Sequence, residues 1–270
     1  MSTTPALFAG LLDDAAMFPP GNASPGDAIA AHLGCRTAWF ADLVGPLLVD
    51  HRRWDEFTYS HAGAGSPALG VVVIGTDEPP PSLPAGLWVS GFELPVSTPP
   101  LPDPGPAYQV ACEITAAPDR AKLFMAVAER RAAGQRVVAK YRTGGVTAAA
   151  FPSDDEVAGV ITEASRHGAP LKFTAGLHHA VRFTDPAMGL ERHGFLNLMV
   201  AVALANRDGD PNAVLAALAE REAQPLVQSV RSWSSDEARS VRAAFVSFGC
   251  CGVEEPVADL VALGLLEKGS

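Results

Sequence analysis

Two short apolar segments of this chain each carry a lysine close to a threonine and glycine. Residues 137–141 contain Lys140, and residues 171–174 contain Lys172. Each run has the length and composition of a buried strand, and one helix signal lies between them. The pattern predicts a strand–helix–strand unit that places both lysines at the same depth. A buried lysine is costly unless it is paired or used, so the pair indicates an active site and favours an enzyme.

The chemistry open to such a pair is nucleophilic. Strand side chains alternate, so Lys140 shares a face with Arg142, and Lys172 shares one with Thr174. Neighbouring strands lie about 4.8 Å apart, and two ammonium groups that close lower each other's pKa. A neutral lysine amine attacks a carbonyl carbon to form a Schiff base. Further polar residues at predicted strand ends are Glu93, Glu113 and Asn197.

The two glutamates complete this catalytic interpretation. Glu93 or Glu113 would act as general acid or base, and the set suits carbon–carbon chemistry of the aldol type. The alternative is a structural network of ion pairs between these glutamates and the cations Lys140, Arg142 and Lys172. Interior ion pairs add little stability and tend to mark functional sites, so we prefer catalysis.

Cationic residues continue after the second lysine. His178 and His179 are adjacent, so both cannot point the same way from a strand, and we expect at least one to face the site; the alternative is that both bond to backbone. Arg182 and His193 extend the patch. Arg142 and Arg182 could hold a carboxylate or phosphate in bidentate fashion. The expected substrate is therefore a small anionic carbonyl compound.

The apolar runs alternate with helix signals along the chain. Because most runs are apolar on both faces, they indicate parallel strands covered on both sides. Eight such runs, with helices between several of them, predict an α/β fold, an irregular (β/α)8 TIM-like barrel. The runner-up is an open doubly wound sheet, but no Gly-x-Gly-x-x-Gly follows any strand. The expected strands are 15–18, 42–49, 68–74, 87–94, 108–114, 137–141, 171–174 and 195–199.

Helix signals fix the connections. Ser153 and Glu156 form a capping box, as do Ser234 and Glu237, and Pro211 stands at a first helical position. Further helices are expected over about 118–133 and from Pro256, whereas the proline-rich stretches 77–84 and 97–106 predict loops. We expect one domain over 1–270, with the barrel at about 13–206 and a helical C-terminal cap at about 207–270.

The composition of the chain argues against several classes of binding partner. With 20 basic and 30 acidic residues the net charge is −10, which argues against nucleic acid and anionic membranes. No apolar run reaches the length of a membrane span, and residues 1–10 lack the features of a secretory signal.

The four cysteines and the acidic pair at residues 13–14 each allow one further prediction. Cys35, Cys112, Cys250 and Cys251 lack zinc-like double-pair spacing, so we expect thiols in a reducing cytoplasm. A redox pair at the adjacent last two is the less favoured alternative. For the acidic pair at 13–14, a solvated turn is favoured over a place at the barrel mouth.

The two lysine segments also resemble known families. Lys140-Tyr-Arg-Thr-Gly-Gly, a capped helix and Lys172-Phe-Thr-Ala-Gly look like the sixth and seventh strands of class I aldolases of the deoxyribose-phosphate-aldolase type. The resemblance implies that Lys140 is the Schiff-base nucleophile and that Lys172 tunes it. Residues 175–179 depart from that family's phosphate-binding turn, so it does not imply a phosphorylated sugar. The chain more closely resembles bacterial proteins of unassigned function that share Lys-x-Arg-x-Gly-Gly and Lys-x-Thr-Ala-Gly-Leu-His-His-x-x-Arg.

Two rival functions stay open at this point. One is a lyase, isomerase or hydrolase that uses a divalent metal held by Glu93, Glu113, His178 and His193, although the chain has no His-x-His spacing and the lysines would repel a cation. The other is a non-catalytic protein that binds a small anion. The preferred interpretation needs no cofactor and no metal, and it leaves a homo-oligomer open.

Overall fold

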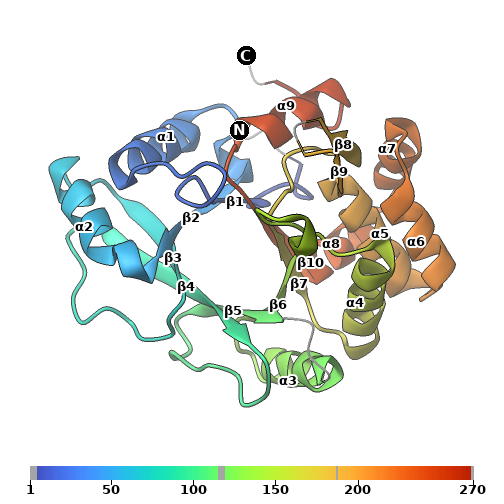
Figure 1. The fold of residues 1–270 in the computed structure, drawn as a ribbon, viewed down its shortest axis with the longest axis horizontal. Coiled ribbons are helices and arrows are strands. Elements are labelled where there is room, and N and C mark those ends of the chain that lie inside the picture. Colours follow the sequence, from blue (N-terminus) through green and yellow to red (C-terminus); the bar gives the residue numbers. More distant parts are fainter. Residues whose placement is uncertain (1–4, 115–118, 187, 269–270) are drawn as a thin grey trace.

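The computed structural model describes residues 5–114, 119–186 and 188–268. Eight parallel strands of this described part close into a barrel, in the order β1-β10-β7-β6-β5-β4-β3-β2 (Figure 1). The predicted (β/α)8-like barrel is confirmed, and the open sheet is excluded. The barrel strands are β1 (Leu12–Asp14), β2 (Val44–Asp50), β3 (Leu69–Ile74), β4 (Leu87–Val96), β5 (Gln109–Ile114), β6 (Val137–Arg142), β7 (Leu171–Thr174) and β10 (Phe245–Cys250).

Helices lie around the barrel, and those between residues 195 and 232 gather on one side of it (Figure 1). They are α1 (Pro25–Thr37), α2 (Trp54–Gly63), α3 (Arg120–Ala132), α4 (Asp154–His167), α5 (Phe195–Arg207), α6 (Pro211–Ala219), α7 (Ala223–Ser232), α8 (Ser235–Ala244) and α9 (Glu254–Ala262). A small antiparallel hairpin, β8 (Phe183–Asp185) with β9 (Leu190–Arg192), lies between β7 and α5. Short 3-10 turns occupy Ala41–Leu43, His51–Arg53 and Ala148–Ala150.

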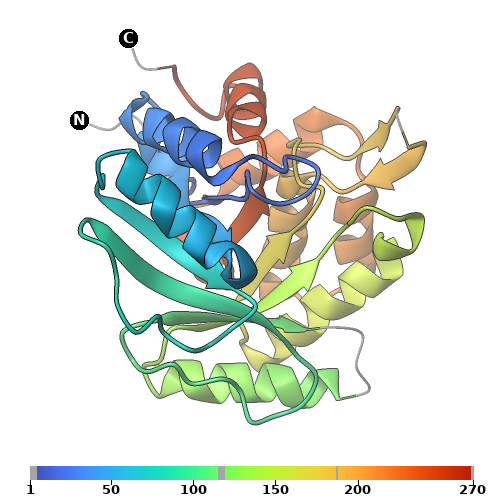
Figure 2. The same ribbon diagram turned by 60° about the vertical axis from the view of Figure 1, so that its left-hand side comes forward.

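The predicted helix signals act as expected. Ser153 caps α4 and Ser234 caps α8, each through a complete capping box, and Pro211 opens α6. The expected helix at 118–133 is α3, whose first predicted residue lies outside the described ranges. The connections at 77–84 and 97–106 are loops, as predicted, and Figure 2 shows these long segments beside β3 and β4.

Three predicted elements differ from the structure. Residues 195–199 are not a strand but the start of α5, which is buried on almost every face and therefore lacks a polar stripe. The first strand lies at Leu12–Asp14 rather than 15–18. The strand that closes the barrel is β10, which lies inside the segment expected to be a helical cap and pairs with both β1 and β7.

Two layers fill the molecule because strand side chains alternate. Outward residues such as Leu47, Val49 and Phe92 pack with Ile29 of α1 and Phe57 of α2. Inward residues line the barrel and differ sharply between its two sides, as described below. In the described ranges, no helix combines the length and the apolar character needed to cross a membrane.

Candidate active site

A chain of buried ion pairs crosses the barrel interior. Lys172 on β7 contacts Asp13 on β1, with Nζ 2.5 Å from Oδ2, and it also contacts Oε1 of Glu93 on β4. Ser247 on β10 donates to the same Asp13 oxygen at 2.7 Å. Because β7 and β4 are not neighbours in the barrel, Lys172 and Glu93 meet across the interior. All four side chains are buried.

The second lysine continues the chain. Lys140 Nζ on β6 lies 2.7 Å from Glu93 Oε2 and 2.9 Å from Glu113 Oε2 on β5. One carboxylate, that of Glu93, therefore bridges the two lysines with its two oxygens. Glu113 is the most open member, since its side chain is 18% exposed against 4% for Lys140 and 2% for Glu93.

Register explains why these residues meet. Lys140 pairs directly with Lys172, and Glu113 pairs with Lys140, so three ionic groups stand in one layer of the barrel. Their strand neighbours Ala139 and Phe173 point the other way, into the outer core. The predicted strand–helix–strand unit with lysines at matched depth is therefore present.

Burial and pairing set the protonation states. Burial raises the pKa of Glu93, but the charges of Lys140 and Lys172 outweigh it and lower that pKa to about 2. Burial lowers the pKa of Lys172, but the carboxylates of Asp13 and Glu93 outweigh this effect, so the pKa of Lys172 is raised. Burial raises the pKa of Asp13 despite Lys172. The expected mutual lowering of the lysine pKa values is thus wrong for Lys172, which stays an ammonium.

Arg142 and Thr174 stand one interior position above the lysines. They pair in register with each other, and alternation turns them to the same side as Lys140 and Lys172. Arg142 is exposed, and Thr174 lies against Gly249 of β10, where an added Cβ would come within 2.9 Å of its Oγ1. Arg142, which was expected to bind the substrate anion, and Thr174 therefore line the carboxyl end of the barrel.

Two other predicted binding residues lie elsewhere. Arg182 pairs with Asp154 of α4 at 2.7 Å and with Glu191 of β9 at 3.0 Å. His193 is buried beside the same Asp154 at 3.8 Å, and burial lowers its pKa. These residues line a cavity of about 400 Å³ between the start of α4 and the β8–β9 hairpin, so they do not join the lysine layer.

Asn197 and His179 make contacts within the surrounding fold rather than with the lysine layer. Asn197 was expected at a strand end, but it is fully buried in α5, where it accepts from the Arg182 backbone and donates to the carbonyls of Ala217 and Glu220. His179 Nδ1 lies 3.2 Å from Asp259 of α9. The convergence predicted for five strand-end residues therefore holds for Glu93, Glu113, Lys140 and Lys172 and is wrong for Asn197.

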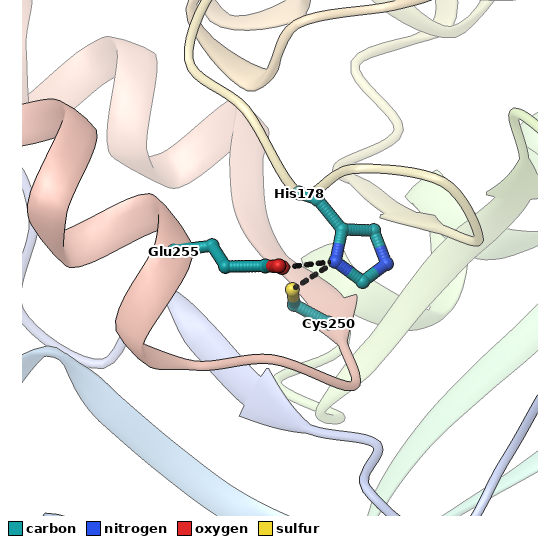
Figure 3. Close-up of side chains that lie close together, drawn as sticks. All are labelled: His178, Cys250 and Glu255. Atoms are coloured by element: carbon teal, nitrogen blue, oxygen red, sulfur yellow. Dashed lines mark hydrogen bonds and ion pairs between the residues drawn. The ribbon is translucent and has the colours of Figure 1, made fainter. Parts of the chain in front are cut away.

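His178 belongs to a separate cluster where β7 and β10 end. Its Nδ1 contacts the Glu255 carboxylate and lies 3.8 Å from Cys250 Sγ (Figure 3). Its Nε2 lies 3.4 Å from Cys251 Sγ. Hydrogen bonds with the two sulfur atoms and the contact with Glu255 raise the pKa of His178. All four cysteines of the chain are unpaired.

Sequence reasoning missed two members of the ionic chain. Asp13 was assigned to a solvated turn, but it is buried against Lys172, while its neighbour Asp14 faces outward to His32 at 3.0 Å. Ser247 lies on the unpredicted β10. The pair Leu11-Leu12 before Asp13 was the available signal, although a three-residue strand is too short for a periodic pattern.

The metal set considered from the sequence does not assemble. Glu93 and Glu113 are paired with lysines, whereas His178 and His193 lie in two other clusters. A scan of protein-family models, a search of curated proteins and a search of solved structures found no match to this chain. The function must therefore be argued from the site.

Proposed function

We propose that this protein is a class I lyase of the aldolase type in which Lys140 forms a Schiff base with a small anionic carbonyl compound. The observation that carries the proposal is the bridging of two in-register lysines by one buried carboxylate, Glu93. Burying several charges contributes little to stability, so their concentration in one layer supports a catalytic role.

The surroundings of the two lysines support different proposed roles. Lys172 is enclosed by Asp13 and Glu93 and has a raised pKa, so it serves as a fixed cation. Lys140 contacts the carboxylate of Glu93 and that of the more exposed Glu113. It is therefore the lysine that a substrate entering from the carboxyl end of the barrel would meet, in agreement with the resemblance to aldolases.

The reaction uses these groups in order. Lys140 transfers a proton to Glu113, and the neutral amine attacks the carbonyl carbon. The carbonyl oxygen leaves as water, so that the products are an iminium ion and one water molecule. Proton return from Glu113 supplies the acid for the loss of water. Lys172 keeps Glu93 ionised throughout, and Arg142 at the mouth would hold the substrate's anionic group.

Borohydride trapping tests the proposal directly. The protein would be incubated with a panel of aldehydes and oxo acids, reduced, and analysed by intact mass and peptide mapping. The chain has four lysines, so the modified position is unambiguous. We expect an adduct on Lys140, abolished in Lys140→Met and retained in Lys122→Met, which removes an exposed lysine of α3. The absence of an adduct with every carbonyl compound between about pH 6 and pH 10, the span over which a perturbed lysine titrates, would refute the Schiff base.

The rival functions keep no comparable support. The predicted metal ligands are separated in the fold, as described above, and a simple anion-binding role does not require a lysine next to a carboxylate that can accept its proton. The expectation of a cytoplasmic protein, and of a substrate that is neither nucleic acid nor membrane, stays a prediction.

A further inference from the structure

A second group of reactive side chains lies at the carboxyl end of the barrel, apart from the ion-pair chain. His178 follows β7, Cys250 ends β10, and Glu255 lies in the first turn of α9. Figure 3 shows the imidazole, thiol and carboxylate pointing toward one another. One potential ligand atom from each of the three lies within 4.8 Å of the other two. The loop after β7 and the β10–α9 turn, more than 70 residues apart in the sequence, thus converge on one point.

The separation of the imidazole from the thiol suits a metal ion. Tetrahedral Zn²⁺ with bonds of about 2.3 Å to sulfur and 2.0–2.1 Å to nitrogen holds its sulfur and nitrogen ligands about 3.6 Å apart. The distance from His178 Nδ1 to Cys250 Sγ is 3.8 Å. The Glu255 carboxylate now contacts the imidazole directly, and its half-exposed side chain is free to withdraw far enough to admit an ion.

The backbone around the cluster makes room for the carboxylate. Gly252 follows the two cysteines, and an added Cβ there would lie 2.6 Å from Glu255 Oε2. Glu255 N also bonds to the Gly252 carbonyl at 3.2 Å, which closes the turn into α9. The missing side chain therefore allows Glu255 to fold back over the end of β10.

The fourth residue orients the imidazole. Cys251 Sγ lies 3.4 Å from His178 Nε2, on the ring edge opposite the other contacts. A metal-binding histidine usually hydrogen-bonds through its second nitrogen, which fixes the ring and tunes the ligand. Cys251 fills that position, and it cannot bind the same ion because the two ring nitrogens face opposite ways.

We propose that His178 Nδ1, Cys250 Sγ and Glu255 Oε2 form a binding site for one Zn²⁺ ion. A thiolate, an imidazole and a carboxylate select a borderline metal such as Zn²⁺ over Mg²⁺ or Ca²⁺, which prefer oxygen ligands only. Three protein ligands leave one position for water or another small ligand. The site ties α9 to the ends of β7 and β10, and it does not depend on the proposed lyase chemistry.

Zinc titration of metal-free protein tests the site. After equilibration and desalting, elemental analysis should give one zinc per chain, and competition with a chromophoric chelator should give its affinity. We expect Cys250→Ser and Glu255→Gln each to weaken binding by more than about 100-fold, beyond the roughly 10- to 100-fold loss typical of residues that only orient a ligand. Cys251→Ser should fall within that smaller range.

Two further measurements separate this site from nonspecific thiol binding. Cys112→Ala removes the buried thiol of β5, and we expect it to leave zinc affinity within about twofold. Cobalt(II) should give a thiolate-to-metal charge-transfer band in the wild type and in Glu255→Gln, but not in Cys250→Ser. Because Glu255 is on the surface, its substitution should not impair folding. Equal affinity of wild type and Cys250→Ser, or no bound zinc in the wild type, would refute the site, and neither result bears on borohydride trapping.

Discussion

The two sides of the barrel interior are filled by opposite chemistry. On the β2–β3 side, Leu48 and Val72 point inward and pack with Ala15 in a small apolar cluster. On the other side, the same interior positions carry the chain of ion pairs from Asp13 to Glu113. The apolar side shows that side-chain packing alone can fill this barrel. The ionic side is therefore the part of the interior on which the proposed function rests.

The ionic side is also uneven within itself. Asp13, Ser247 and Glu93 enclose Lys172, whereas Lys140 adjoins the partly exposed Glu113. A cation held on every side is suited to fixing charge, and one beside an open carboxylate is suited to exchanging protons. Two identical side chains at one depth thus differ in chemistry because their neighbours on other strands differ.

The largest expected effect comes from removing the shared carboxylate. Glu93→Gln keeps the shape but leaves Lys140 and Lys172 facing each other without their bridging anion. Breaking a buried pair in this way costs about 3–5 kcal/mol, and the loss should appear in urea unfolding at neutral pH.

Glu113→Gln is the matched control for that substitution. It makes the same chemical change at a carboxylate that water reaches, so its cost should be clearly smaller. If both variants lose the same stability, the ionic side does not divide into a closed and an open part.

The loss of folding stability at acidic pH should depend on protonation of the same carboxylate, that of Glu93. The folded pKa of Glu93 is about 2, below its ordinary 4.5, so its contribution is complete above pH 4.5 and is lost as pH falls toward 2. The shift corresponds to about 3 kcal/mol. Asp13 acts in the opposite sense, because its raised pKa gives stability at low pH that is lost as pH rises through that folded value.

Comparison of variants separates these opposing contributions. Unfolding of wild type and Glu93→Gln would be measured from about pH 2 to pH 6, the range that spans both carboxylate transitions. The difference between the two free energies should shrink as pH falls below 4.5. A difference that is constant over this range would show that Glu93 is not ionised by its lysine partners. The raised pKa of Lys172 contributes stability that is complete below the ordinary lysine pKa of 10.5 and is lost as pH rises toward the folded value.

A smaller effect is expected at the barrel mouth. Arg142→Lys keeps the charge but loses the two-pronged geometry that binds a carboxylate. If Arg142 holds the substrate anion, adduct formation should need a higher pyruvate concentration for half-saturation. The increase should correspond to a loss of about 1.5–3 kcal/mol of binding free energy. Acetaldehyde, which lacks the carboxylate, should be unaffected. An equal change with both compounds would assign Arg142 a structural role.

The sequence predicted the ionic layer better than the elements at its edges. Lys140 and Lys172 stand in strands with clear apolar flanks and a capped helix between them, so local patterns determine their register. Glu93 and Glu113 follow from the same alternation. Their ion-pair partners could not be predicted in this way, because Lys172 contacts Asp13, a residue 159 positions away in the sequence.

The errors have physical causes. A helix buried on nearly all sides, such as α5, has the same unbroken apolar pattern as a buried strand, and only its length distinguishes them. The β10 strand follows a strongly capped helix and was absorbed into the predicted helical region. Asn197 was misplaced with α5. The cluster of His178, Cys250 and Glu255 depends on the ends of β7 and β10 being neighbours, which no local pattern encodes.

The smallest expected loss of stability would come from making the ionic side resemble the apolar one. Combining Asp13→Leu, Glu93→Met, Glu113→Met, Lys140→Met and Lys172→Met replaces all the charges of the ion-pair chain with apolar groups of similar size. Buried ion pairs replaced in this way commonly leave stability unchanged or raise it by about 1–4 kcal/mol. We expect a folded variant with urea unfolding at or above the wild-type midpoint that forms no borohydride-stable adduct. A large loss of stability would mean that the charges hold the barrel together, and the comparison of its two sides would then favour a structural network over a catalytic one.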